Sequence, residues 1–300
     1  MESIFVDSET NKPLVVTRSN KVASKFGNFD RKPLEILDFV TAKLARESAV
    51  YAHMKFSVVL DDLAFLIFGS NSKKKPTPQQ LSRVRNYIHR LCRTPLVMQG
   101  REHYLFSDYS YRHINGSDRQ EVVFELSDDL TVIRYFCEED KGFYSCRLNI
   151  LNAIENVTDY RLFSLGIGSL KGNISVTLEE NMTQLNKTFR GDKEYSRPNA
   201  AVNALRNSAK RLNQNSTLKD IYYFSVKPVH DPSQSNKFLF LRIKVINLAK
   251  KRSSKISDPD LESSELAILN HDPTLKDFYK KTVNALDKGD FDYDSFNPIF

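Results

Sequence analysis

The sequence predicts an α+β protein in which one order of elements, helices followed by a β-hairpin, occurs twice along 300 residues. Three observations favour this fold class. Two probable helices, in residues 78–93 and 199–214, carry basic side chains along one side. Segments with the alternating pattern of strands follow each of them. A short β-prone segment and a helix precede each of them, so the two halves of the chain match in pattern.

The first half begins with two apolar helices. Residues 33–50 place Leu34, Leu37 and Thr41 on one side of a helix, as core packing requires. A β-prone segment follows at residues 56–59, and then a helix that ends at Gly69, because glycine suits the C-cap. We expect two pairs of acids to occupy helix N-termini, where the helix dipole favours them: Asp61 with Asp62, and Asp128 with Asp129.

The start of the third helix of this half is marked by two residues. Thr77 is a good N-cap residue, and Pro78 suits the first helical position, where a missing N–H costs nothing. Apolar residues then recur three and four positions apart and predict a buried stripe of Leu81, Val84, Ile88 and Leu91. On a second stripe, about 200° away, lie Arg83, Asn86, Arg90 and Arg93.

The basic stripe has two interpretations. One is an ordinary solvated helix surface. The other is a nucleic-acid contact, favoured because no acid occurs between Gln79 and Gly100 and because a strand, a turn at Gly100 and Arg101, and a second strand follow at residues 94–106. A helix followed by a basic hairpin predicts a winged helix. Lysines in the preceding loop would then meet DNA phosphates: Lys73, Lys74 and Lys75.

The second half repeats this order. Residues 148–170 predict helix, and residues 174–186 predict a short strand and then a helix with Glu179 and Glu180 at its N-terminus. The basic helix at 199–214 has a buried stripe of Val202, Leu205, Ala209 and Leu212. Its other side, again without an acid, holds Asn203, Arg206, Asn207, Lys210 and Arg211. Two strands, at 220–229 and 237–247, follow; their aromatic residues predict core packing rather than base stacking.

Charge divides the chain unevenly. Residues 257–300 contain ten acids and four lysines, a net charge of −6, so residues 1–256 carry +13. We therefore expect an N-terminal segment (1–30), a first winged-helix domain (31–140), a second (141–256) and an acidic C-terminal tail (257–300). A basic body indicates a polyanionic partner such as nucleic acid or an anionic membrane surface.

Other classes of protein find little support. Cys92, Cys137 and Cys146 lack metal-ligand spacing and predict reduced thiols. The chain has neither a signal-peptide pattern nor an apolar run of the ~18 residues that a membrane span requires, so we expect a cytoplasmic protein without a membrane partner. The six histidines do not form the metal-binding pair of a nicking enzyme, and residues 166–172 lack the order of a phosphate-binding loop. We expect neither enzymatic activity nor a cofactor nor a bound metal.

The order of elements resembles that of iteron-binding plasmid replication initiators, which fold as tandem winged-helix domains. The resemblance covers roughly residues 15–250. It rests on VVTRSNKV near residue 15, on VVFELSDDLTVIRYF, and on FRGDKEYSRPNAAVNALRNSAKRLNQ with the strands that follow. The family implies a protein that binds repeated sites on double-stranded DNA at a plasmid origin and helps to open the duplex.

The resemblance also implies contacts and partners. The helix at 199–214 would enter a major groove, and Arg197 precedes it. Arg101 would belong to the first hairpin, and the second hairpin and the segment after it would hold the DNA backbone through Arg242, Lys244, Lys250, Lys251 and Arg252. Host replication proteins, such as an initiator and a helicase, would be partners, and a homodimer would repress the protein's own gene. The alternative is a winged-helix transcriptional regulator or phage-type repressor without a replication role.

The acidic tail leads to a testable prediction. Removing residues 257–300 deletes a net charge of −6 and should strengthen nonspecific DNA binding, because repulsion between the tail and phosphates is lost. Binding of the full chain and the truncated chain to random-sequence duplex, compared over a salt series, tests this. Unchanged or weaker binding by the truncated chain would reject it.

Overall fold

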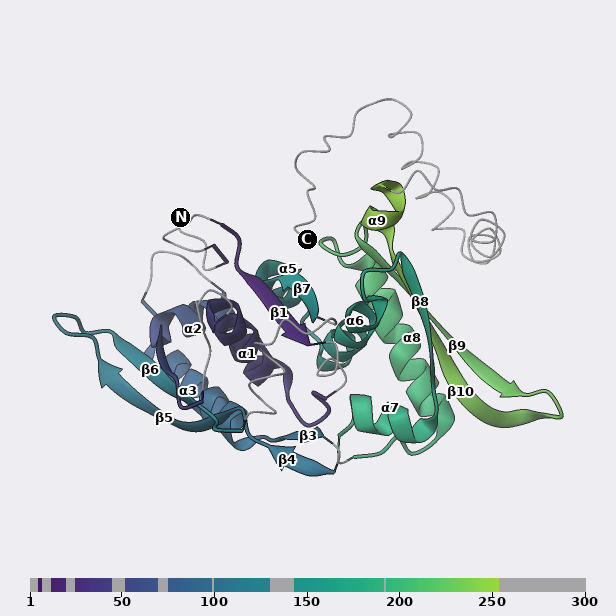
Figure 1. Cartoon of the computed structure of the whole chain (residues 1–300), viewed down its shortest axis with the longest axis horizontal. Coiled ribbons are helices and arrows are strands. Elements are labelled where there is room, and N and C mark those ends of the chain that lie inside the picture. The colour runs from purple at the N-terminus through teal and green to yellow at the C-terminus, as the bar shows by residue number, and fades with distance from the viewer. Residues whose placement is uncertain are drawn as a thin grey trace. The chain divides into compact units, whose positions relative to one another are not determined.

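The structure is a computed structural model, and it describes residues 5–6, 12–19, 25–44, 52–69, 75–98, 100–129, 143–191 and 193–253. The chain divides into two compact units, Met1–Ala249 and Lys250–Phe300. The first unit is a mixed α+β structure with several small antiparallel sheets, which confirms the α+β prediction (Figure 1). The expected acidic tail, Cys137, Lys73 and Lys74 lie outside the described residues.

The first half of this unit contains three helices and a three-stranded sheet. Its helices are α1 (Arg31–Leu44), α2 (Leu60–Phe68) and α3 (Pro78–Arg93), and strand β2 (Lys55–Val59) lies between α1 and α2. Strands β5 (Phe106–His113) and β6 (Gln120–Leu126) form the large hairpin, and the sheet has the order β2-β6-β5. Thr77 is the N-cap of α3, as predicted, and it also forms a capping box with Gln80. Gly69 ends α2, and Asp61 and Asp62 lie in its first turn.

The hairpin directly after α3 differs from the prediction. The chain forms a small ribbon from β3 (Leu96–Met98) and β4 (Arg101–His103), so Arg101 lies in a strand rather than in the turn. The expected second strand at 104–106 instead leads into β5, whose residues Phe106, Tyr109 and Tyr111 pack against the core. The larger hairpin therefore turns at residues 114–119, where Ile114 and Arg119 are hydrogen bonded and Gly116 has a positive φ. Asp128 and Asp129 lie two and three residues after the end of β6; the residues after them lie outside the described part.

The second half has the same order of elements. Helix α6 (Val157–Leu170) is followed by β8 (Ser175–Glu180), α7 (Met182–Phe189), α8 (Pro198–Gln214) and the hairpin of β9 (Tyr222–Asp231) and β10 (Gln234–Asn247). Its sheet has the order β8-β10-β9, which corresponds to β2-β6-β5 in the first half. In both sheets the strand between the helices therefore pairs with the last strand of the hairpin.

Two local predictions were wrong in the second half, and a third, that residues 148–170 are largely helical, was right except for an interruption. Glu179 and Glu180 lie in β8, and the N-cap of α7 is Asn181, which forms a capping box with Gln184. The expected helix at 148–170 is two helices, α5 (Leu148–Asn152) and α6, separated by residues 153–156. The loop expected at 230–236 is largely strand, because β9 and β10 continue to a tight turn at Pro232 and Ser233.

The N-terminal segment also contains a strand. Residues Val15–Ser19 form β1, which pairs antiparallel with β7 (Phe143–Arg147). Leu14 and Val16 are buried there, and the carbonyl of Leu14 accepts a hydrogen bond from the backbone of Leu148 at the start of α5. Among the described residues, the partner strand of β1 lies about 130 residues away, so local pattern did not reveal β1.

Helix α6 continues through two glycines because it packs closely against the second sheet. A Cβ atom on Gly166 would lie 2.8 Å from the side chain of Val245 in β10 and 2.9 Å from the ring of Phe224 in β9. Neither distance is possible for a real side chain, so glycine permits this approach, although it lowers helix propensity by about 1 kcal/mol relative to alanine. The helix then ends at Lys171, which adopts a left-handed conformation.

Arg161 of α6 is a buried cation that joins three backbone segments. Its guanidinium donates hydrogen bonds to the carbonyl oxygens of Phe26, at 3.0 Å, Phe29, at 2.5 Å, and Phe189 at the end of α7. Burial lowers the pKa of Arg161 to about 10, so the side chain remains a cation at neutral pH. It thereby holds the loop before α1 next to the end of α7.

Two glycines at the same place allow the backbones to touch. A Cβ atom on Gly27 would lie 2.4 Å from the carbonyl oxygen of Lys187, and one on Gly191 would collide with Asn28. Gly191 also has a φ of 64°. The loop of residues 25–30 and the segment after α7 therefore meet with no room for side chains, and the Arg161 hydrogen bonds lie beside this contact.

We predict that Arg161→Met strongly destabilises the protein. The substitution keeps a long apolar stem but leaves three carbonyl oxygens without their donor, which should lower the free energy of unfolding by about 3 kcal/mol or more. Chemical denaturation of the full chain measures the change. Arg83→Met, at an exposed position on α3, is the matched control and should change stability by less than about 0.5 kcal/mol. Equal stability of the two variants would contradict the prediction.

Candidate nucleic-acid interface

Helix α8 has one buried side and one polar side. Its buried residues include Val202, Leu205, Ala209 and Leu212, the stripe that the sequence predicted. The exposed residues Asn203, Arg206, Asn207 and Lys210 occupy the other side. The helix contains no acid, and no acid among the described residues forms an ion pair with any of these four. This side of α8 therefore presents two cations and two amides to solvent.

Strand β9 holds α8 along one side. The side-chain amide of Asn213 donates to the carbonyl oxygen of Phe224 and accepts from its N–H, both at 2.8 Å. Arg206 Nε lies 3.4 Å from the carbonyl oxygen of Val226, two residues further along the strand. Because β9 is an edge strand of its sheet, its outer backbone groups need partners, and α8 supplies them. The helix is thus held in a definite orientation.

Arg211 has a different role from the rest of the predicted DNA-binding set. Its guanidinium forms a bidentate interaction with the buried carboxylate of Asp159 in α6, with N···O distances of 2.6 and 2.7 Å. Ser208 Oγ donates to the same carboxylate at 2.5 Å. The hydrogen bond with Asp159 raises the pKa of Arg211. This side chain therefore binds α8 to α6 rather than projecting toward a ligand.

Helix α3 also has an exposed basic side. Arg83, Asn86 and Arg93 are exposed, while Val84, Ile88 and Leu91 are buried and Leu81 is half-buried. Arg83 and Arg93 have no ion-pair partner among the residues that the structure describes. Arg90, in contrast, forms an ion pair with Asp30 in the loop before α1. The predicted basic stripe is therefore present, but one of its arginines has an acidic partner.

A further arginine of α3 was missed by the sequence analysis. The Arg85 guanidinium lies 5.6 Å above the ring of Tyr111 and donates to the side chain of Gln120 at 2.6 Å. His89 contacts Tyr109 at 2.8 Å on the same hairpin. These contacts hold α3 against β5 and β6. Since the partners are 20 to 35 residues away, only the alternating tyrosines of β5 could have suggested them.

The remaining predicted DNA-binding residues differ in their exposure to solvent. Lys75 and Arg101 are exposed, and Arg197 is exposed at the N-cap position of α8. Lys250 and Lys251 are half-buried in the short helix α9 (Leu248–Ser253), which also contains Arg252. No helix in the described part of the chain is long and apolar enough to span a membrane.

The outer surface of the second sheet carries the two predicted hairpin residues. Arg242 is exposed and forms an ion pair with Glu179 of β8 at 2.7 Å. Lys244 is half-buried; burial lowers its pKa, and the nearby Lys227 lowers it further. Lys227 is itself exposed and opposite Arg242, and the sequence analysis missed it. Its position in an alternating strand, directly after the buried Val226, was the available signal.

Comparisons with known proteins agree with the fold. No protein-family model matches the chain, and no curated protein matches its sequence. Among solved structures, the chain is similar to the Pi initiator protein in its crystal structure with iteron DNA, with a TM-score of 0.52 and 13% sequence identity. The similarity covers 78% of this chain and 97% of that one. The chain therefore has, distantly, the fold of an initiator protein.

Arg211 allows a direct test of the structural assignment. We predict that Arg211→Met lowers the free energy of unfolding by about 2–3 kcal/mol, because it leaves the buried Asp159 carboxylate without its cation. Lys210→Met, the adjacent exposed position, should change stability little. Thermal and urea unfolding of both variants measure the change in the free energy of unfolding. A stable Arg211→Met protein with weakened DNA binding would contradict this assignment and return Arg211 to the DNA-binding set.

Proposed function

We propose that this protein is a sequence-specific binder of double-stranded DNA that initiates plasmid replication at repeated origin sites. The proposal depends mainly on one observation: α8 has an exposed side without acids, and hydrogen bonds hold the helix against β9. Support also comes from the fold that the chain shares with an initiator protein crystallised with iteron DNA. We interpret the two repeated sets of elements as tandem winged-helix domains, the first from residue 31 to 140 and the second from 141 to 256.

In this proposal α8 is the recognition helix. Asn203, Arg206, Asn207 and Lys210 lie three and four residues apart, so they can follow one major groove. Asparagine forms a bidentate pair with adenine, and arginine forms one with guanine, so these side chains can read base edges. Lys210 would bind phosphate. The hydrogen bonds to β9 keep α8 from rotating, which limits the bases that each side chain can reach.

Helix α3 supplies a second set of contacts. Arg83, Asn86 and Arg93 would bind a neighbouring part of the site, and Lys75 and Arg101 would bind phosphates at its edges. Arg90 would contribute mainly by holding α3 to the loop before α1. Because arginine binds both guanine and phosphate, the residue type does not assign these contacts to bases.

The biological role follows from the initiator interpretation. Binding to several repeats would help to open the origin and would bring host replication proteins, such as an initiator and a helicase, to the DNA. A homodimer would repress the protein's own gene. The protein would act in the cytoplasm without enzymatic activity or a cofactor. A transcriptional regulator with the same DNA-binding elements is the alternative, and loss of plasmid replication on deletion of the gene distinguishes the two.

The first experiment measures binding to a labelled duplex that contains the repeats upstream of the protein's own gene. We expect a preference for the repeats over scrambled DNA, and an affinity that falls steeply with salt because lysines and arginines release counterions from phosphates. Equal binding to both duplexes across the salt series would reduce the protein to a basic, nonspecific DNA binder and would end the proposal.

Arg206→Ala tests the recognition helix. We predict that it weakens binding to the repeats by ~1–3 kcal/mol, or roughly 5- to 150-fold, and reduces the preference over scrambled DNA. Lys219→Ala, at an exposed position beyond the end of α8, is the charge-matched control and should retain the preference. Because Arg206 also approaches Val226, thermal unfolding of each variant must show an intact fold. Unchanged specificity in a folded Arg206→Ala protein would exclude Arg206 from base reading.

A further inference from the structure

The hairpin of the second half extends past its own sheet. Strand β8 pairs with Leu241–Ile246 of β10, whereas Gln234, Phe238 and Phe240 pair with β9, with register shifts between Gln234 and Phe238 and between Phe238 and Phe240. The end of the hairpin is therefore a two-stranded ribbon, which Figure 1 shows projecting beyond β8. A two-stranded ribbon has no hydrophobic core of its own, so its side chains lie close to solvent or to a partner.

A β-bulge interrupts this ribbon at Leu239. Phe238 is opposite His230 and Phe240 is opposite Val229, so β10 has one extra residue between two consecutive residues of β9. The ring of Phe238 packs edge-on against His230, with centroids 6.4 Å apart, and the Arg242 guanidinium lies 5.7 Å from the centre of the Phe240 ring. Bulges redirect the side chain of the extra residue. The neighbouring aromatic rings have contacts within the ribbon, and Leu239 is left 38% exposed.

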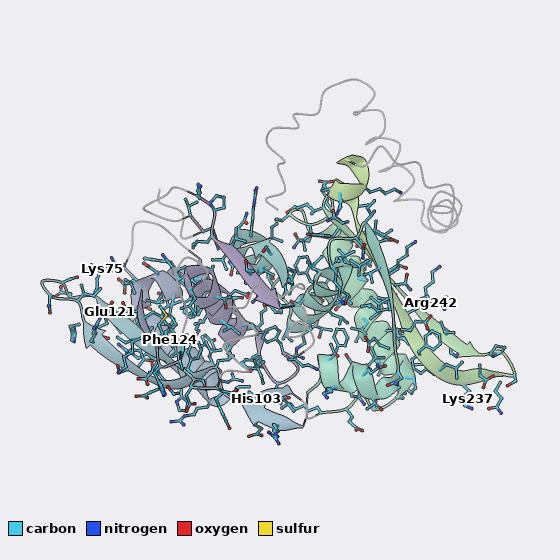
Figure 2. The ribbon with its side chains drawn as sticks, in the orientation of Figure 1. Lys75, His103, Glu121, Phe124, Lys237 and Arg242 are labelled. Atoms are coloured by element: carbon cyan, nitrogen blue, oxygen red, sulfur yellow. The ribbon has the colours of Figure 1, made fainter. Side chains whose placement is uncertain are left out.

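Cations surround this leucine. Lys237 lies at the far end of the ribbon and Arg242 further back along β10, as Figure 2 shows, and Lys227 is opposite Arg242 on β9. The acid of the ribbon, Asp231, accepts two hydrogen bonds from Ser233 and lies 3.6 Å from Lys237. These hydrogen bonds lower the pKa of Asp231 and order the turn. The ribbon is therefore an ordered, positively charged arm with an exposed apolar side chain.

A single exposed leucine is ordinary on a protein surface. Two features indicate that Leu239 has a functional role. A bulge directs it outward, although its neighbours in the same strand pack within the ribbon, and it lies between side chains suited to phosphates on either side. Architectural DNA-binding proteins insert apolar side chains between base pairs in the minor groove and kink the duplex, while flanking cations bind the backbone. The ribbon has the same combination of groups.

We propose that the end of the β9–β10 ribbon binds the DNA minor groove next to the site of α8, and that Leu239 enters between two base pairs there. Lys237 binds phosphate on one side of the insertion and Lys227 on the other, while Arg242 keeps its ion pair with Glu179. The insertion unstacks one base step and bends the duplex. This inference rests on the proposed function and adds a second contact element with a mechanical effect on the DNA.

The test uses the full chain and the duplex that contains the repeats. Energy transfer between dyes at the two ends of the duplex measures bending. A fluorescent adenine analogue, 2-aminopurine, placed in turn at each adenine beside the α8 site, reports unstacking by a rise in fluorescence. The variants are Leu239→Ser and, as the matched control, Tyr104→Ser, which changes the other large hydrophobic residue that is strongly exposed in the described part of the chain, at 41%.

We expect the natural protein and Tyr104→Ser to bend the duplex and to unstack one base step. Leu239→Ser should abolish the fluorescence rise and most of the bend while weakening binding by less than roughly tenfold, because the lost apolar contact is partly offset by the unstacking energy that is no longer spent.

Four outcomes would overturn the inference. One is a natural protein that binds the repeats specifically but leaves the duplex straight and stacked, and another is equal bending by the natural protein and Leu239→Ser. The third is loss of bending in Leu239→Ser and Tyr104→Ser alike. In these three cases the proposed function still stands if the repeats are preferred. The fourth is no preference for the repeats by the natural protein, which removes the proposed function and this inference together.

Discussion

The hydrogen bonds of one buried guanidinium hold together much of the first unit. Arg161 belongs to a run of three consecutive residues on α6, each of which contacts a different element. Asp159 binds Ser208 and Arg211 of α8, Tyr160 donates to Asp38 of α1 at 2.7 Å, and Arg161 binds the loop before α1 and the end of α7. Consecutive helical residues point about 100° apart, so the three directions together span about 200° around the helix. The position of α6 thereby determines where its neighbours lie.

Arg31 makes the corresponding contacts from α1. It donates to the carbonyl oxygens of Leu151 and Ile154 near the end of α5, and its guanidinium carbon lies 4.6 Å from the centre of the Tyr160 ring. Glu35 and Asp38 are buried beside it, and burial is the main cause of the raised pKa of Glu35. Buried charges are costly to desolvate and add little net stability, but their directional hydrogen bonds exclude alternative packings. Their contribution here is a definite arrangement of α1, α5 and α6.

The sequence predicted what depends on local pattern and missed what depends on distant partners. The buried stripes of α3 and α8, the N-cap at Thr77 and the repeated order of elements could be read from residue type and spacing. The pairing of β1 with β7 and the close packing of Gly166 could not, because each depends on residues far along the chain. Glu179 was also misplaced because it lies between an alternating segment and a helix, so its residue type fits either element. Its pairing with Arg242 of β10 shows that it belongs to the sheet.

The exposed basic sides of α3 and α8 were predicted from the sequence, but residue type alone did not separate their arginines. Arg206, Arg211 and Arg90 are all exposed on basic helices, and they differ in what lies opposite them. A buried carboxylate faces Arg211, a loop aspartate faces Arg90, and a backbone carbonyl faces Arg206. Each acidic partner neutralises one cation and lowers the local attraction for phosphate. The positive potential of α8 is therefore concentrated near Arg206 and Lys210 rather than spread along the helix.

The different contacts of Arg206 and Arg211 affect how precisely α8 is oriented. Base recognition requires side chains held close to their productive geometry, and a helix free to roll on its domain would lose that precision. Arg211 fastens one side of α8 to α6, and Asn213 fastens another to β9. Both restraints lie in the C-terminal half of α8, while Asn203 and Arg206 lie nearer its N-terminus. Arg211, held by Asp159, thus helps to orient Asn203 and Arg206, which we propose contact DNA.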